Sequence, residues 1–221
     1  MTGDLVVVGA GGFGREVIDV VRAINAVRSG SWNVIGVVDD SPSELNLSRL
    51  SQLGVAYLGS RAALADVPPD TLVSIGIGAP SARISIADDI ERLGLRSAQI
   101  VHPAAVFGST FSTGEGLVAC AGVSVGTNVT LGRHVHLNPH AVIGHDSVLD
   151  DFVSVNPNAT VSGDCRIGTA VLIGASAVVL EGREVSDDVV VGAAACVVGP
   201  SKPGDVLVGV PARPLRNGVT G

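Results

Sequence analysis

A six-residue repeat is the feature that most constrains the fold of this 221-residue chain. From residue 125 to residue 197, every sixth residue is Val, Leu or Ile, without a break. These thirteen positions are Val125, Leu131, Leu137, Ile143, Leu149, Val155, Val161, Ile167, Ile173, Val179, Val185, Val191 and Val197. Neither an α-helix, with its period of about 3.6, nor an alternating strand, with its period of about two, gives such a spacing. The repeat therefore predicts a stacked, repetitive architecture and not a low-complexity stretch or strands that fall in phase by chance.

The repeat has a recognisable internal pattern. Glycine often follows the aliphatic residue, as at Gly126, Gly144 and Gly168, and the residue two positions before the aliphatic one is usually small or β-branched. This pattern resembles that of the hexapeptide-repeat family. The resemblance implies a left-handed parallel β-helix over residues 101–200, in which three hexapeptides form one triangular coil. A weaker extension of the register back to Val101 gives five to six coils, which at the usual strand spacing make a prism roughly 25 Å tall.

The first hundred residues follow a different rule. An apolar run, Leu5–Val8, leads into a glycine turn, and apolar residues then recur at helical spacing. Further strands are expected at 34–38, near 55–58 and at 72–77, with a helix over 81–93. This alternation predicts a small Rossmann-like parallel sheet, with the glycine turn and the strand ends at one ligand crevice.

The glycine turn, Gly9-Ala10-Gly11-Gly12-Phe13-Gly14, allows more than one interpretation. With an acidic residue some 25 positions later it fits a dinucleotide fingerprint, and it also fits a turn that only lets a helix start close to a strand. A nicotinamide enzyme needs a second half-sheet and a substrate domain, whereas this chain continues directly into the repeats. We therefore do not expect dehydrogenase chemistry.

The two halves together resemble one family of enzymes. The segment GAGGFGREV, the acidic pair Asp39-Asp40, the strand end IGIGAP, the junction VHPAAV, the hexapeptides and the closing GVPARPLR occur in that order. This order is similar to that of the bacterial sugar acyltransferases, which include sialic acid O-acetyltransferases and the nucleotide-amino-sugar N-acetyltransferases of the bacillosamine and perosamine pathways. The resemblance implies direct acyl transfer from acetyl-CoA without a metal, and a homotrimer with the acyl-CoA groove between neighbouring prisms.

The resemblance also implies a catalytic site. Acyl transfer needs a base for the acceptor's proton and a donor for the oxyanion. His145, followed by Asp146, matches the family's general base and the acidic residue that orients it, and this pairing requires a bend at the coil's corner. Gly163, eighteen residues after His145, stacks beside the base and matches the family's backbone donor. Asn138 is a further expected polar contact to the acceptor.

Two other mechanisms are less well supported by the sequence. A covalent acyl-cysteine would need a thiol beside the base, but none of Cys120, Cys165 and Cys196 lies one coil from His145. A zinc site would need a third imidazole beside His140 and His145, and the positions one coil away carry none.

The resemblance also implies which residues contact the nucleotide sugar and coenzyme A. A nucleotide sugar would meet residues of the N-terminal domain, and coenzyme A would meet small residues of the repeats. The first set is Gly11, Gly12, Phe13, Asp39, Asp40 and Gly78, and the second is Ser154, Ala175 and Ala193. Phe13 and Ser154 stand where the amino-sugar enzymes carry histidines, so the nature of the sugar is less constrained than the acyl transfer itself.

Composition limits the partners of the chain. Fourteen basic and twenty-one acidic residues give a formal charge of −7, which opposes nucleic-acid binding. The most apolar run, 167–180, is interrupted by polar residues and is shorter than the roughly 20 residues of a membrane span. The start of the chain has no basic leader before its apolar run. We therefore expect a cytoplasmic protein without nucleic-acid or membrane partners.

These observations predict three segments and one function. The segments are a Rossmann-like (nucleotide-)sugar-binding domain at 1–100, a β-helix acyltransferase domain at 101–200 and a C-terminal tail at 201–221. The function is acyl transfer, with acetyl as the default group, to an amino or hydroxyl group of a sugar that is carried on a nucleotide. The alternatives are an acyltransferase for a free small molecule or a sugar without a nucleotide, and a non-catalytic trimeric scaffold.

Overall fold

The computed structural model describes residues 3–215, which form two compact units. The first comprises Met1–Pro103 and Glu115–Cys120, and the second comprises Ala104–Gly114 and Ala121–Gly221. The last six residues of the predicted tail lie outside the described residues, as does the end of GVPARPLR.

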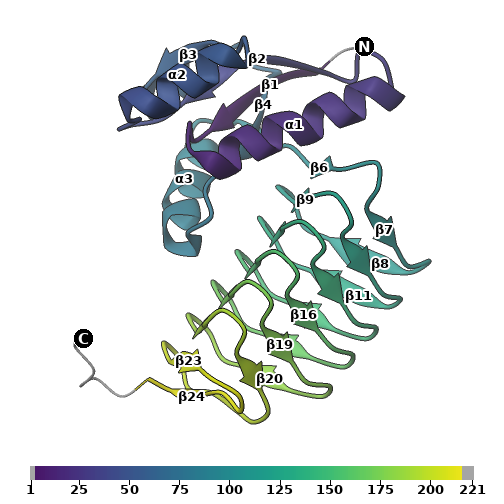
Figure 1. Cartoon of the computed structure of the whole chain (residues 1–221). Helices are drawn as coiled ribbons and strands as arrows, with labels where there is room; N and C mark the ends of the chain where they lie inside the picture. Colours follow the sequence, from purple (N-terminus) through teal and green to yellow (C-terminus); the bar gives the residue numbers. More distant parts are fainter. Residues whose placement is uncertain (1–2, 216–221) are drawn as a thin grey trace. The chain divides into compact units, whose positions relative to one another are not determined.

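The first unit is a five-stranded parallel sheet with helices between its strands (Figure 1). Its sheet order is β3-β2-β1-β4-β5. β2 and β3 are therefore added on one side of β1, and β4 and β5 are added on its other side. The elements are β1 (Gly3–Val8), α1 (Gly12–Val27), β2 (Trp32–Val38), α2 (Glu44–Gln52), β3 (Tyr57–Gly59), a 3₁₀ turn (Arg61–Asp66), β4 (Leu72–Ile75), α3 (Pro80–Arg92) and β5 (Arg96–Ser97). Such a reversal of strand order creates a crevice at the carboxyl ends of the strands.

The core of the first unit explains why these segments fold together. Leu5 and Val7 of β1 pack against the apolar face of α1, which contributes Val17, Ile18 and Val21. α2 begins at the cap Ser43, whose side chain accepts a hydrogen bond from the Asn46 N–H at 3.2 Å. The sequence pattern did not predict α2, because that segment has little apolar periodicity and buries only Leu50.

The second unit is a left-handed parallel β-helix, as the repeat predicted (Figure 1). Its short strands form three faces, in the orders β22-β19-β16-β13-β10-β7, β20-β17-β14-β11-β8 and β24-β23-β21-β18-β15-β12. In the pairs from β7 to β22, paired residues are eighteen positions apart, for example Ile143 and Val161, which is one complete coil. All thirteen aliphatic positions from Val125 to Val197 are buried.

The strands of the repeat region are two or three residues long. β6 (Ile100–Val101) and β9 (Val118–Ala119) pair with each other in the first unit. The others are β7 (Val106–Phe107), β8 (Phe111–Thr113), β10 (Ser124–Val125), β11 (Val129–Leu131), β12 (His136–Leu137), β13 (Val142–Ile143), β14 (Val148–Leu149), β15 (Ser154–Val155), β16 (Thr160–Val161), β17 (Arg166–Ile167), β18 (Leu172–Ile173), β19 (Val178–Val179), β20 (Glu184–Val185), β21 (Val190–Val191), β22 (Cys196–Val197), β23 (Val206–Val208) and β24 (Arg213–Pro214).

The corners of the β-helix use the left-handed backbone region. Non-glycine residues with positive φ recur at six-residue spacing, and Asn128 (φ 56°) and Asp146 (φ 61°) are two of them. Asn and Asp tolerate this region better than most residues. The corners therefore turn the chain sharply between faces and present their side chains in vertical rows.

Candidate active site

His145 lies at a corner of the β-helix, directly after β13. The positive φ of Asp146 supplies the bend that the predicted pairing requires, and brings Asp146 Oδ2 to 2.7 Å from His145 Nδ1. Both side chains are about half exposed, at 57% and 48%. When Nδ1 carries the proton and donates it to the carboxylate, Nε2 keeps the lone pair that a base needs.

Asp146 has a second partner, which the sequence pattern did not identify. Asn128 Nδ2 donates to Asp146 Oδ1 at 2.7 Å, from the same corner one coil earlier. Hydrogen bonds from Asn128 and then from His145 lower the pKa of Asp146 below its ordinary value of 3.8. The carboxylate therefore stays ionised while it holds the imidazole.

Gly163 lies one coil after His145, against its ring. A Cβ at Gly163 would be 2.7 Å from both Cε1 and Nε2 of His145, so only glycine fits beside the imidazole in this position. The neighbouring Asp164 N–H donates to the His145 carbonyl at 2.8 Å, which ties the two coils together. The Gly163 N–H itself donates to no group within residues 3–215.

The glycines of the turn in the first unit divide into two groups. Any side chain at Gly14 would collide with the Gly9 carbonyl, and one at Gly76 would collide with Gly14, so these three let α1 approach the strand ends. A Cβ added at Gly11 or Gly12 would meet no atom within 4 Å, so both residues line open space at the start of α1. The packing interpretation of the motif therefore applies to Gly9 and Gly14, and Gly11 and Gly12 leave room for a ligand.

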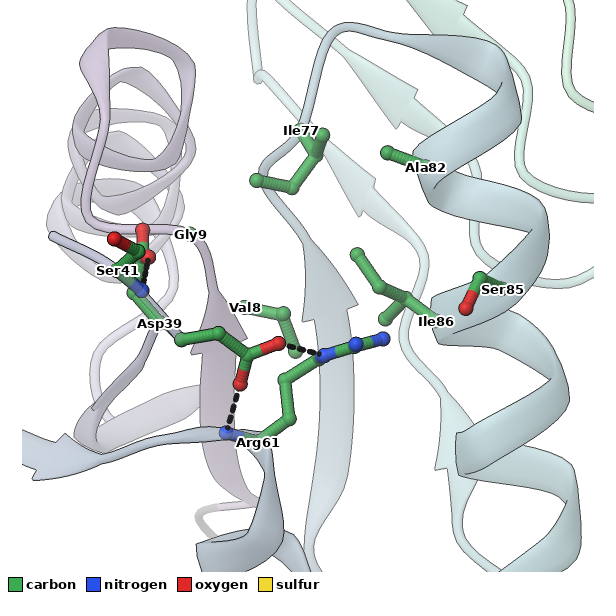
Figure 2. Close-up of a pocket in the computed structure, with 10 residues that line it drawn as sticks. Val8, Gly9, Asp39, Ser41, Arg61, Ile77, Ala82, Ser85 and Ile86 are labelled. Atoms are coloured by element: carbon green, nitrogen blue, oxygen red, sulfur yellow. Dashed lines mark hydrogen bonds and ion pairs between the residues drawn. The ribbon is translucent and has the colours of Figure 1, made fainter.

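A cavity of about 270 Å³ opens at the carboxyl ends of β1, β2 and β4 (Figure 2). It is lined by Val8, Gly9, Asp39, Asp40, Ser41, Arg61, Ile77, Ala82, Ser85 and Ile86. The predicted acidic pair is in this lining, and Arg61 and Ser85 are polar members that the sequence pattern missed. No spacing signal identifies those two, because they come from the 3₁₀ turn and from α3.

Both acidic side chains are already hydrogen-bonded within the protein. Asp39 accepts from the Ala10 N–H at 2.8 Å and from the Ser41 N–H at 2.9 Å, which joins the glycine turn to the end of β2. Asp40 accepts from the Arg61 N–H at 2.8 Å and forms an ion pair with the Arg61 guanidinium. The Arg61 N–H and then its side chain lower the pKa of Asp40.

The other residues predicted to bind the sugar do not line this cavity. Phe13 is half-buried and packs against the core of the first unit. Gly78 is exposed, and its carbonyl accepts from Arg83 at 2.8 Å. Burial lowers the pKa of Arg83 to about 9.

The predicted contacts in the second unit occupy separate places. Asn138 is buried and donates to the Val155 carbonyl of the next coil at 3.2 Å, so its amide is part of the coil stacking. Ala175 and Ala193 lie one above the other at one corner, because the Ala194 N–H donates to the Ala175 carbonyl at 2.9 Å. Ser154 is 1% exposed and lies within β15, where it pairs with a residue of β18. It is therefore on a sheet face and not at the corner where the two alanines lie.

One cysteine, Cys165, lies close in sequence to Gly163. Cys165 is buried two residues after Gly163, its thiol donates to the Leu180 carbonyl at 3.2 Å, and burial raises its pKa. Across residues 3–215, no three His, Cys, Asp or Glu side chains form a group that could hold a metal ion. Among the helices described, none is long and apolar enough to cross a membrane.

The histidine-carboxylate corner of the β-helix unit and the crevice of the Rossmann-like unit can be compared with those of known proteins. Residues 4–90 match the family model described as the PglD N-terminal domain. The GDP-perosamine N-acetyltransferase of Escherichia coli O157:H7 is 26% identical over 144 residues, which is 65% of this chain. That match spans 63% of the curated relative's own length.

Solved structures match nearly the whole chain. The acetyltransferase domain of PglB from Neisseria gonorrhoeae FA1090, in complex with acetyl coenzyme A, is 27% identical with a TM-score of 0.84, and the match covers 97% of this chain and 100% of that one. PerB from Caulobacter crescentus, in complex with CoA and GDP-perosamine, is 26% identical with a TM-score of 0.86, and the match covers 98% and 99%. The resemblance to hexapeptide-repeat sugar acetyltransferases that the sequence predicted is therefore confirmed.

Proposed function

We propose that the protein transfers an acetyl group from acetyl-CoA to an amino or hydroxyl group of a nucleotide-linked sugar, with His145 as the general base. The observation that carries this proposal is the corner at which Asp146 holds His145 Nδ1 at 2.7 Å and Gly163 leaves the ring edge free of side chains. The acetyl-CoA complex of PglB and the CoA and GDP-perosamine complex of PerB support both ligands.

The reaction follows from this geometry. His145 Nε2 takes the proton of the acceptor nucleophile as its N or O attacks the thioester carbon. The carbonyl oxygen becomes an oxyanion, and the unbonded Gly163 N–H is our candidate donor to it. When the intermediate collapses, the C–S bond breaks and the coenzyme A thiolate takes the proton from the imidazolium.

The cavity between Asp39, Arg61 and Ser85 is our candidate site for the nucleotide part of the acceptor. It combines apolar walls from Val8 and Ile86 with hydroxyl and charged groups that suit a base and a ribose. The open turn at Gly11 and Gly12 lies at the start of α1, where free backbone N–H groups favour a diphosphate. Coenzyme A would pass the corner at which Ala175 and Ala193 lie one above the other.

We further propose a cytoplasmic homotrimer. The outward residues of the face that contains β7 to β22 are Val106, Ser124, Val142, Thr160, Val178 and Cys196, so valines alternate with hydroxyl residues in most of this row. Val106 is 64% exposed and Val142 is 38% exposed, so these apolar side chains have no cover within the described chain. Such a face suits contact with a second copy.

Acetyl-CoA consumption by purified wild type and His145→Ala tests the central proposal. Loss of a general base should lower kcat by about 10² to 10⁴ and leave equilibrium binding of coenzyme A unchanged. His140→Ala is the control, because His140 is another exposed histidine at a corner of the β-helix. Full activity of His145→Ala would refute the role of His145, and no transfer by wild type to the amino or hydroxyl groups of any UDP- or GDP-sugar would refute the proposed acceptor class.

A further inference from the structure

The carboxylate of Asp146 is held at both of its oxygens. Oδ2 meets His145 Nδ1 and Oδ1 accepts from Asn128 Nδ2, each at 2.7 Å. The two partners come from different coils, since Asn128 precedes Asp146 by eighteen residues. Asp146 is therefore a bridge between an amide in one coil and an imidazole in the next.

An exposed carboxylate with a single partner does not keep one orientation. Surface ion pairs contribute little because both side chains lose rotamer freedom and water competes for the same atoms. A second hydrogen bond, to the other oxygen, removes rotation about the Cβ–Cγ bond of Asp146. The imidazole then has one fixed acceptor, and Nε2 is directed away from it.

Asn128 is itself held in place. Its backbone N–H donates to the Thr110 carbonyl at 2.6 Å and to Thr110 Oγ1 at 3.1 Å, and Thr110 Oγ1 lies 2.8 Å from Thr127 Oγ1. Its φ of 56° is in the region that Asn tolerates. The hydrogen bond from Asn128 is also the main cause that lowers the pKa of Asp146.

We propose that Asn128 is a positioning residue for acyl transfer, which acts on His145 only through Asp146. This inference rests on the proposed role of His145 as the base. It assigns a function to a side chain whose hydrogen bond goes to the carboxylate of Asp146 and not to the imidazole. The proposed catalytic group is then a hydrogen-bonded chain of Asn128, Asp146 and His145, which come from two successive coils.

Asn128→Gly removes the amide and keeps the backbone conformation, because glycine accepts positive φ without strain. We expect kcat to fall about threefold to thirtyfold, in the range of measured side-chain couplings, with the KM for acetyl-CoA unchanged. Asn158→Gly is the matched control, since Asn158 is an exposed corner Asn with φ 58°. It should keep wild-type kcat.

A double variant separates positioning from general folding support. If Asn128 acts through Asp146, then Asn128→Gly/Asp146→Ala should be no slower than Asp146→Ala alone. Asn128→Asp keeps the size and the corner conformation but loses the donor, so it should be at least as slow as Asn128→Gly. Additive losses in the double variant, or wild-type kcat in both single variants, would overturn the proposal.

A carboxyl NMR titration gives a readout that does not depend on turnover. The pKa of Asp146 should rise toward its ordinary value in Asn128→Gly and stay unchanged in Asn158→Gly. An unchanged pKa in Asn128→Gly would show that the hydrogen bond is absent in solution and would overturn the inference. Absence of any acyl transfer by wild type, together with the expected pKa rise, would refute only the proposed function and the catalytic meaning of the Asn128–Asp146 bridge.

Discussion

At the scale of single residues, the site depends on contacts between successive coils. The adjacent pair His145-Asp146 could be predicted because a family motif marks it in the sequence. The Asn128–Asp146 bond could not be predicted in the same way, because nothing local connects positions eighteen apart. Only the register of the coils brings these two positions together. The family motif marks His145, but Asn128 contacts Asp146 and not His145, so the motif does not lead to Asn128.

The first prediction concerns Gly163. Replacement by Ala places a methyl group 2.7 Å from the His145 ring, so the ring has to move. Misplacement of a reacting group by about 1 Å can cost roughly 10²-fold, and we expect Gly163→Ala to lower kcat by about tenfold to a hundredfold. Steady-state kinetics check this, with Gly199→Ala as control, because a Cβ at Gly199 meets no atom within 4 Å.

Asp40 gives a pH-dependent prediction. Its folded-state pKa is lowered by the Arg61 N–H and then by the Arg61 side chain. A lowered pKa means that the pairing contributes stability above the ordinary pKa of about 4, and that this contribution is lost as the pH falls through the folded value. Denaturant unfolding followed by circular dichroism should show that the free energy of unfolding of wild type falls as the pH is lowered, and that this decrease is smaller in Asp40→Asn. Identical pH profiles for the two proteins would contradict this.

Among the structural elements, the sequence pattern predicted the strands of the β-helix but not the backbone conformation of its corners. The six-residue period was sufficient for the β-helix, because each aliphatic residue points into the prism. The corners were not predictable from propensity, since Phe152 (φ 62°) and Ala170 (φ 58°) adopt positive φ although neither type favours it. There the hydrogen bonds of the stacked coils impose the backbone conformation.

The contact between α1 and the sheet gives a prediction at this scale. Gly14→Ala inserts a methyl group against the Gly9 carbonyl and should destabilise the first unit by about 1–3 kcal/mol or more. Gly12→Ala, in the same turn, meets open space and should keep or slightly raise stability, since Ala is favoured over Gly in helices. Denaturant unfolding of the two variants measures the difference. If Gly12 contacts the acceptor as proposed, Gly12→Ala should nevertheless raise the acceptor KM.

For the whole molecule, the proposed trimer has to be tested in solution, because the structure describes a single chain. The exposed valines Val106 and Val142 on one face lead us to expect a sedimenting species of three times 22.2 kDa at micromolar concentration. Val142→Asp, which puts charges into the centre of that face, should favour the monomer. A wild-type protein that sediments only as a 22.2 kDa species would contradict the trimer.

The second unit contains phenylalanines but no tryptophan or tyrosine, and this decides how the protein can be observed. The chain's single Trp and single Tyr, Trp32 and Tyr57, are in β2 and β3 of the first unit. Intrinsic fluorescence therefore reports the melting of the Rossmann-like unit, and the unit that carries His145 contributes no tryptophan signal. A dye-free fluorescence melt of a His145 or Gly163 variant would be expected to resemble that of wild type even if its β-helix had loosened, so far-ultraviolet circular dichroism has to accompany every thermal comparison of those variants.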